Sequence, residues 1–413
     1  QNVSRQEDIY PLVYYYIAYG YQNLHRKENT EQANCYMTMY VTLGENAAAD
    51  GCFPHRTEDY IVLKSLAEEY HLAMAYYYLG CLLYDRRVYD ESIEDYEESI
   101  LRSPDFPTVH RNLALAYYNV KKLPQRAYEE MEKAFALDET DARVYLELDQ
   151  LKKRLNVAVK ERWSDMEKHF DLVESRDDLY LEYVTLLNTL GEPEKALGLI
   201  KARKFHQWEG GEGKVAAQYL TALYQLAKAA VEKEDYAEAK ELLLRAVGEY
   251  PHNLGEGKLE SGQENNLYYL LGLVQEKLGE AKDAFESLTR ACCGESEPVG
   301  MMYYNDQPPE MIYYQGLAYR MLGEEEQAVR RFQKLVDYGR EHIRDDVKID
   351  YFAVSLPDLL IFEENLNERN RKHCLFMMSL GLKGLGRIDE AEKCAEELLA
   401  MDNAHQEIRV HDL

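Results

Sequence analysis

Aromatic, acidic and amide side chains gather with glycines in four segments of this 413-residue sequence. A flat ring can stack on the CH face of a sugar, and carboxylates or amides beside it can hydrogen-bond the hydroxyls at the rim. The same groups on long loops can equally hold a peptide. The candidate ligand- or partner-binding residues are Trp208, Glu209, Glu212 and Lys214, then Asn253, Glu256, Lys258 and Glu264, then Tyr303, Tyr304 and Asn305, and finally Asp350 and Tyr351.

The tetrapeptide Gly-Glu-Gly-Lys occurs in two of these segments, at 211–214 and at 255–258. Glycine permits backbone conformations that other residues avoid, and it permits the close approach of a partner. A second interpretation stays open, in which each tetrapeptide ends one helix and begins the next turn. Neither is a phosphate-binding P-loop, because the GxxxxGK[ST] spacing is absent.

Catalysis by a carboxylate pair is a further possibility for these segments. Acid–base work on a glycosidic bond needs two carboxyl groups roughly 5 to 10 Å apart, a distance that sequence spacing does not reveal. In an acidic protein most carboxylates are solvated or cap helices. We therefore favour no catalysis by this chain alone and leave the question open. The carboxylates concerned are Glu209, Glu212, Glu256, Glu264 and Asp350.

Histidines and cysteines show no metal-ligand spacing. HExxH and CxxC are both absent, and the seven cysteines are scattered apart from the pair Cys292 and Cys293. The sequence predicts no metal, no cofactor, and free thiols in a reducing cytoplasm. Among the histidines, His206 is singled out as a candidate because it lies beside Trp208.

The net charge is −27, from 75 acidic against 48 basic residues. Such a field repels phosphate backbones and anionic lipid surfaces, so neither nucleic acid nor a membrane is an expected partner. No apolar run approaches the ~20 residues that a membrane-spanning helix needs. The 35 tyrosines are expected to fill helix interfaces.

Internal repeats organise the elements that must position these residues. A clean copy runs from Ala73 to Phe106, and another begins at Pro107. Downstream, a small residue is followed by glycine seven positions later and alanine five positions after that. The glycine suits a left-handed turn that ends the first helix, and the alanine suits a close helix crossing. Three copies of this signature are Gly272, Gly279 and Ala284; Gly316, Gly323 and Ala328; and Ser379, Gly386 and Ala391.

This ~34-residue helix–turn–helix pattern is that of the tetratricopeptide repeat (TPR). We predict an all-α, right-handed TPR-type superhelical solenoid of antiparallel helix pairs, with long loop insertions in its C-terminal half. The predicted parts of one continuous solenoid are 1–70 with divergent N-terminal pairs, 71–176 with TPR pairs and a poorly patterned helical segment, and 177–413 with TPR pairs and inserted loops.

The later repeats are longer than a bare TPR, and the surplus always falls between one helix pair and the next. Because equivalent loops of a solenoid stack along one edge, we expect the four candidate segments to lie side by side. These surplus segments are Phe205–Val215, Pro251–Glu264, Gly294–Pro308 and Arg344–Arg371.

Several of these stretches resemble the C-terminal region of a family of large, mostly uncharacterised bacterial proteins. The stretches are PDFPTVHRNLALAYYN, FHQWEGGEGKV, NLGEGKL, YYNDQPPEM and KIDYFAVSLPDLL. In that family a mutarotase-like β-sandwich domain of unknown function precedes tetratricopeptide repeats. The resemblance implies that this chain is the TPR part without the sandwich, in a carbohydrate-related setting.

The leading hypothesis is a TPR scaffold that binds a protein partner, or its own N-terminal domain, through its concave face and its stacked loops. The alternative is an oligosaccharide-binding or carbohydrate-processing module that acts with the missing β-sandwich. A peptide adaptor that uses only the groove is a third interpretation. Arg111 and Asn112 are its isolated hint, since no second repeat supplies matching basic residues.

Overall fold

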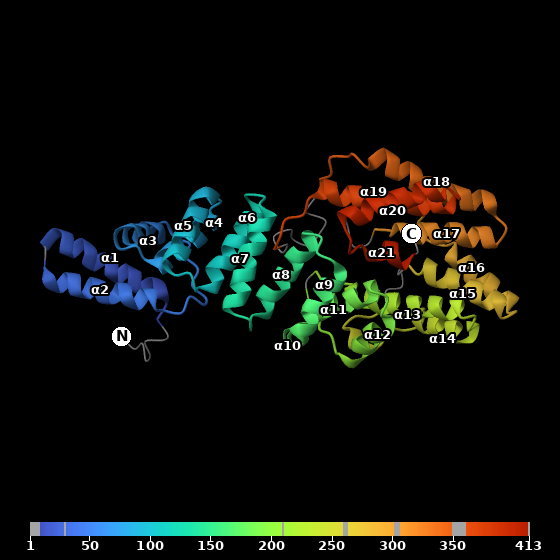
Figure 1. Ribbon diagram of the computed structural model, residues 1–413, viewed down its shortest axis with the longest axis horizontal. Helices are drawn as coiled ribbons and strands as arrows, with labels where there is room; N and C mark the ends of the chain where they lie inside the picture. The colour runs from blue at the N-terminus through green and yellow to red at the C-terminus, as the bar shows by residue number, and fades with distance from the viewer. Residues whose placement is uncertain are drawn as a thin grey trace. The chain divides into compact units, whose positions relative to one another are not determined.

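In the computed structural model, all regular secondary structure of the described residues is helical (Figure 1). The described residues are 9–28, 30–208, 210–258, 263–300, 306–348 and 361–411. The helices are α1 (Pro11–Glu28), α2 (Glu31–Glu45), α3 (Thr57–Tyr70), α4 (Ala73–Asp85), α5 (Tyr89–Arg102), α6 (Pro107–Asn119), α7 (Pro124–Leu137), α8 (Ala142–Arg154), α9 (Val159–Lys168), α10 (Phe170–Ser175), α11 (Asp177–Thr189), α12 (Pro193–Ala202), α13 (Lys214–Glu232), α14 (Tyr236–Ala246), α15 (Asn265–Lys277), α16 (Ala281–Ala291), α17 (Pro309–Met321), α18 (Glu325–His342), α19 (Leu366–Gly384), α20 (Ile388–Met401) and α21 (Gln406–Val410).

The chain forms two compact units. Unit 1 comprises Gln1–Leu151 with Ile361–Glu363, and unit 2 comprises Lys152–Leu360 with Glu364–Leu413. Neighbouring helices pack as antiparallel pairs, α1/α2, α4/α5 and α6/α7 in unit 1 and α11/α12 through α19/α20 in unit 2. The predicted all-α fold of helix pairs is confirmed. The predicted division at 70/71 and 176/177 stays a prediction.

Within a pair, the two helices approach each other where one of them carries glycine. A Cβ atom on Gly80 of α4 would lie 2.5 Å from the Tyr96 ring of α5, and one on Gly316 of α17 would lie 2.5 Å from the Phe332 ring of α18. Such distances are far below van der Waals contact. In these two pairs the small residue is therefore required by the aromatic ring that packs on it, and at Gly272 it is required by the Leu288 side chain, which a Cβ would meet at 2.7 Å.

The second glycine of the signature turns the chain between the helices of a pair. It has a positive φ in each copy, which an L-residue with a side chain adopts only at a cost. The predicted left-handed turn is confirmed at Gly279 (φ +79°), Gly323 (φ +82°) and Gly386 (φ +75°).

Tyrosines pack in the core of both units, as the sequence predicts. Tyr15, Tyr78, Tyr145 and Tyr219 are among the largest side chains that are almost fully buried. None of the described helices is long and apolar enough to span a lipid bilayer.

Replacing Gly80 with alanine should destabilise the protein by about 1–3 kcal/mol, because the new methyl group overlaps the Tyr96 ring. Urea unfolding followed by circular dichroism measures this loss. Gly20 is the matched control, since it is exposed within α1 and a Cβ there would meet nothing within 4 Å. Gly20→Ala should be neutral or slightly stabilising. Equal effects of the two substitutions would contradict the close crossing.

Candidate functional site

The first two surplus loops of unit 2 lie side by side. The backbone N–H of Phe205 donates to the carbonyl oxygen of Asn253 at 2.8 Å. Gly255, with φ +80°, lies so close to the Phe205 carbonyl that a Cβ would be 3.0 Å from its oxygen. The predicted stacking of loops is thereby confirmed for this pair.

Asn253 and Glu256 of the second loop hold the ends of neighbouring helices. The Nδ2 of Asn253 donates to the carbonyl oxygens of Ile200 and Arg203, at 2.7 and 2.8 Å, at the C-terminal end of α12. The Glu256 carboxylate accepts from two backbone N–H groups at the start of α13, at 2.8 and 3.2 Å. Both side chains therefore satisfy helix ends that would otherwise lack partners.

Lys258 and Glu264 form a partly buried pair in the same loop region. The Lys258 Nζ lies 2.8 Å from Glu264 Oε1 and donates to the Val247 carbonyl oxygen at 2.6 Å, just after α14. Burial raises the pKa of Glu264, and the Lys258 ammonium opposes that rise. This pair, like Asn253 and Glu256, has intramolecular partners.

Trp208 is half-buried and packs on Gly211, where a Cβ would lie 2.2 Å from the indole ring. Glu212 and Lys214 are exposed beside it. These three therefore keep surface that a partner can reach. The remaining six candidates lie outside the described residues: Glu209, Tyr303, Tyr304, Asn305, Asp350 and Tyr351. The assignment of all thirteen candidates as binding residues stays a prediction.

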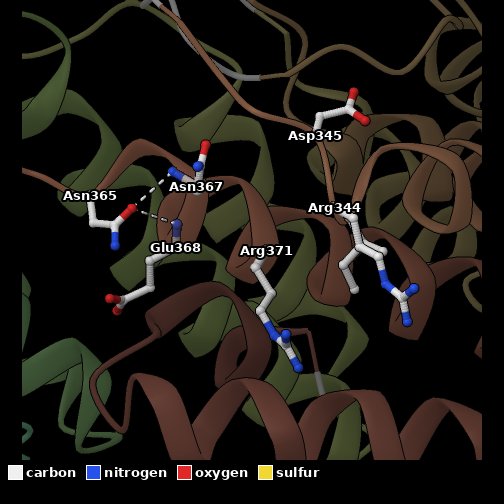
Figure 2. A pocket seen from close by; sticks show the side chains of 7 residues that line it. Arg344, Asp345, Asn365, Asn367, Glu368 and Arg371 are labelled. Carbon is white, nitrogen blue, oxygen red and sulfur yellow. Dashed lines mark hydrogen bonds between the residues drawn. The ribbon is translucent and has the colours of Figure 1, made fainter.

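A pocket of about 360 Å³ lies between the C-terminal end of α18 and the start of α19, at the base of the fourth surplus loop (Figure 2). The Asn365 side chain accepts from the backbone N–H groups of Asn367 and Glu368, at 3.1 and 3.2 Å, and so caps α19. Side chains of both charge signs and amides line the pocket: Ile343, Arg344, Asp345, Asn365, Asn367, Glu368 and Arg371.

Metal-ligating groups do not converge in the described part of the chain, where no three His, Cys, Asp or Glu side chains could hold an ion together. All seven cysteines fall in that part and are free thiols. The absence of a cofactor stays a prediction.

Arg111, the basic residue considered for gripping a peptide, is engaged within unit 1. Its guanidinium donates to both carboxylate oxygens of Glu147, at 2.6 Å each, and the Glu147 side chain is fully buried. Arg111 also donates to the Asn112 side chain at 3.2 Å. A bidentate, buried pair of this kind fixes the guanidinium in place.

In unit 2, a short segment that follows α20 packs across the first helices of several pairs. This segment contains α21 and His411, and it contacts α11, α13, α17 and α19. We call the surface that these four helices present to Gln406–His411 the inner groove. Gln406, Ile408, Val410 and His411 are buried there, whereas Glu407 and Arg409 are exposed.

Polar contacts hold both ends of the segment. The Gln406 Nε2 donates to the Thr185 carbonyl and to the Thr189 hydroxyl, at 3.2 Å each, and Gln218 donates back to Gln406 Oε1 at 2.9 Å. These partners belong to α11 and α13. One side chain of the segment therefore joins two successive repeats.

At the other end, three side chains form a buried hydrogen-bonded row. The His411 Nδ1 lies 2.9 Å from the Tyr314 hydroxyl, which lies 2.6 Å from the Tyr224 hydroxyl. Burial lowers the pKa of His411 to about 3, and the charges of Lys228 and Lys383 add to the effect. The imidazole is therefore neutral at physiological pH.

The sequence pattern missed this groove, because its residues are ordinary helix positions far from the segment they hold. Gln218 and Gln406 are separated by 188 positions. The sequence signal that could have found the segment is the alternation of apolar Ile408 and Val410 with charged Glu407 and Arg409.

Glu310, in the first turn of α17, is a buried carboxyl whose pKa is raised by burial, and further by the Glu407 carboxylate, from 4.5 to about 8. Between pH 4.5 and about pH 8, Glu310 keeps its proton in the folded chain and has lost it in the unfolded chain. Stability therefore falls as the pH rises through this window. Glu310→Gln removes this titration, so from pH 5 to pH 8 the native protein should lose at least about 2 °C of melting temperature relative to the variant.

Thermal unfolding followed by circular dichroism at both pH values measures this difference. Glu392→Gln, at an exposed position of α20, is the matched control and should follow the native pH profile. Parallel profiles for native protein and Glu310→Gln would contradict the buried, protonated state of Glu310.

Models of the family described as "Tetratricopeptide repeat" match three stretches of the chain. One model matches residues 77–142 and 224–298, and a second model with the same description matches residues 310–338. The β-sandwich domain implied by the family resemblance has no match among these findings and stays a prediction.

Solved structures similar to this chain include the following three, all at low identity. MamA is 17% identical, over 64% of this chain and 95% of its own, with a TM-score of 0.18. YrrB, described as "a TPR protein with an unusual peptide-binding site", is 18% identical, over 60% and 98%, with a TM-score of 0.22. Naa15/Naa10 bound to HypK-THB is 12% identical, over 83% and 48%, with a TM-score of 0.38. On the family models, the chain carries tetratricopeptide repeats in both of its compact units.

Proposed function

We propose that this chain is a TPR scaffold that binds a segment of a partner protein in the inner groove of unit 2. The observation that carries the proposal is the seating of Gln406–His411, because side chains from successive repeats already hold a short peptide segment there. Tetratricopeptide stacks present such extended surfaces by repeating one helix of each pair.

The groove recognises main chain as well as side chains. The Lys228 ammonium donates to the Val410 carbonyl oxygen at 2.9 Å, and the Lys383 ammonium lies 3.5 Å from the His411 carbonyl oxygen. Main-chain carbonyls are present in every peptide. The two lysines therefore favour peptide over other ligand classes, while the buried Ile408 and Val410 provide apolar anchors.

The loop edge is proposed as a second protein-binding surface. Exposed Glu212 and Lys214 and half-buried Trp208 are its accessible candidates in the first loop. A carbohydrate site would need an exposed ring beside several free carboxylates. Trp208 is half-buried against Gly211, Glu256 caps α13 and Glu264 pairs with Lys258, which leaves Glu212 as the exposed carboxylate among the described loop candidates. These observations favour a protein partner over an oligosaccharide.

A phage-displayed library of random 12-residue peptides, panned against the full chain, tests the inner groove. Native chain and the Ile408→Asp variant are both used as targets, because we expect the substitution to vacate the groove. We expect selected peptides to lose at least tenfold in affinity on Gln218→Ala or Lys228→Ala, since those side chains hold peptide groups. Fluorescence polarisation measures the affinities.

The loop variant Lys214→Ala is the control and should leave groove-selected peptides unaffected. The proposal fails if neither target selects peptides whose affinity depends on Gln218 or Lys228. Peptides that depend only on Lys214 would move the binding site to the loop edge.

A further inference from the structure

We infer that Gln406–His411 is a resident ligand of the inner groove, and that a partner must displace it with a segment of the same chemistry. This inference rests on the proposed function and adds to it the identity of the competitor and the class of peptide that binds. The groove is then a peptide site that the chain keeps occupied.

The contacts of the segment are those of a ligand rather than of a core helix. Its α21 helix has five residues, too few to be stable by itself in water. Its buried side chains alternate with the exposed Glu407 and Arg409. The surrounding protein therefore imposes the conformation, as a receptor does on a bound peptide.

The anchors define a chemical pattern. An amide at the first position faces Gln218, branched apolar residues follow at the third and fifth positions, and a neutral hydrogen-bonding group at the sixth faces Tyr314. The second and fourth positions face solvent. A partner segment with the pattern amide–x–branched apolar–x–branched apolar–polar fits the same contacts.

The base of the segment is held separately, just before α21. The Asn403 backbone N–H and Nδ2 bond the Asn156 side-chain and main-chain oxygens at 2.7 and 2.6 Å, in the turn between α8 and α9. Release of Gln406–His411 therefore leaves its origin beside the groove. A tethered competitor acts at high effective concentration, so it suppresses weak ligands and yields to strong ones.

A fluorescein-labelled peptide with the sequence of residues 404–411 is the probe, titrated with full-length chain in a polarisation assay. Ile408→Asp puts a carboxylate at a fully buried position and should unseat the chain's own segment. Arg409→Asp, the matched control, puts the same carboxylate one residue later on the exposed side, where the Arg409 guanidinium donates at 2.9 Å to the carbonyl oxygen of Asn403, which is not part of the inner groove. We expect Ile408→Asp to bind the probe at least tenfold more tightly than native chain, and Arg409→Asp to match native.

Hydrogen exchange of residues 406–411 shows whether the segment has left its seat, and should rise in Ile408→Asp alone. Val410→Asp replaces Ile408→Asp if the first variant lowers the melting temperature. A probe carrying aspartate in place of its isoleucine should not bind any of these chains.

Equal affinity of the probe for native and unseated chains would overturn the competition while leaving the groove a peptide site. No binding of the probe to an unseated chain that still binds library peptides would overturn the assignment of the segment as a ligand. If the unseated chain binds neither the probe nor any library peptide, the proposed function itself fails.

Discussion

The close crossing of the two helices in each pair is the constraint on which the rest of this structure depends. Gly80 admits the ring of Tyr96, and Gly316 admits that of Phe332, at distances that leave no room for a Cβ. Because each pair is held at this short separation, successive pairs can stack in register. The first helices of the pairs in unit 2 then form one face, and the first two surplus loops lie side by side.

Helix ends set the second requirement, which is met by amide side chains in an inter-repeat loop and near the starts of α15 and α19. Asn253 bonds the last carbonyls of α12, Asn265 donates to the Ala291 carbonyl oxygen at 2.8 Å, and Asn370 donates to that of His342 at 2.7 Å. Buried helix ends need such partners. The polar composition that suggests a ligand site in these loops is thus explained in part by capping.

The features that repeat along the sequence could be predicted from it, whereas contacts between residues far apart in the chain could not. Repeat glycines such as Gly279 indicated both the pairs and their turns, since spacing and backbone conformation are local properties. The surplus loops followed from the same spacing. The capping roles of Asn253 and Glu256 could not be predicted, because their partners lie 40 or more positions away. The inner groove could not be predicted either, because the contacts of Gln406 with α11 and α13 form only when the helix pairs have stacked.

Part of the contact between the inner groove and its bound segment is made at the C-terminal end of α21, and this explains which features of a ligand the groove can recognise. The last carbonyls of a helix lack internal partners, and in α21 the Lys228 ammonium reaches the one on Val410. That contact is to main chain and distinguishes no side chain. Selectivity therefore rests on the buried positions of Gln406, Ile408 and Val410, whereas Glu407 and Arg409 between them are exposed. The Lys228 and Lys383 ammonium groups lie at this end of the segment, where positive charge favours the electronegative C-terminal end of a helical turn.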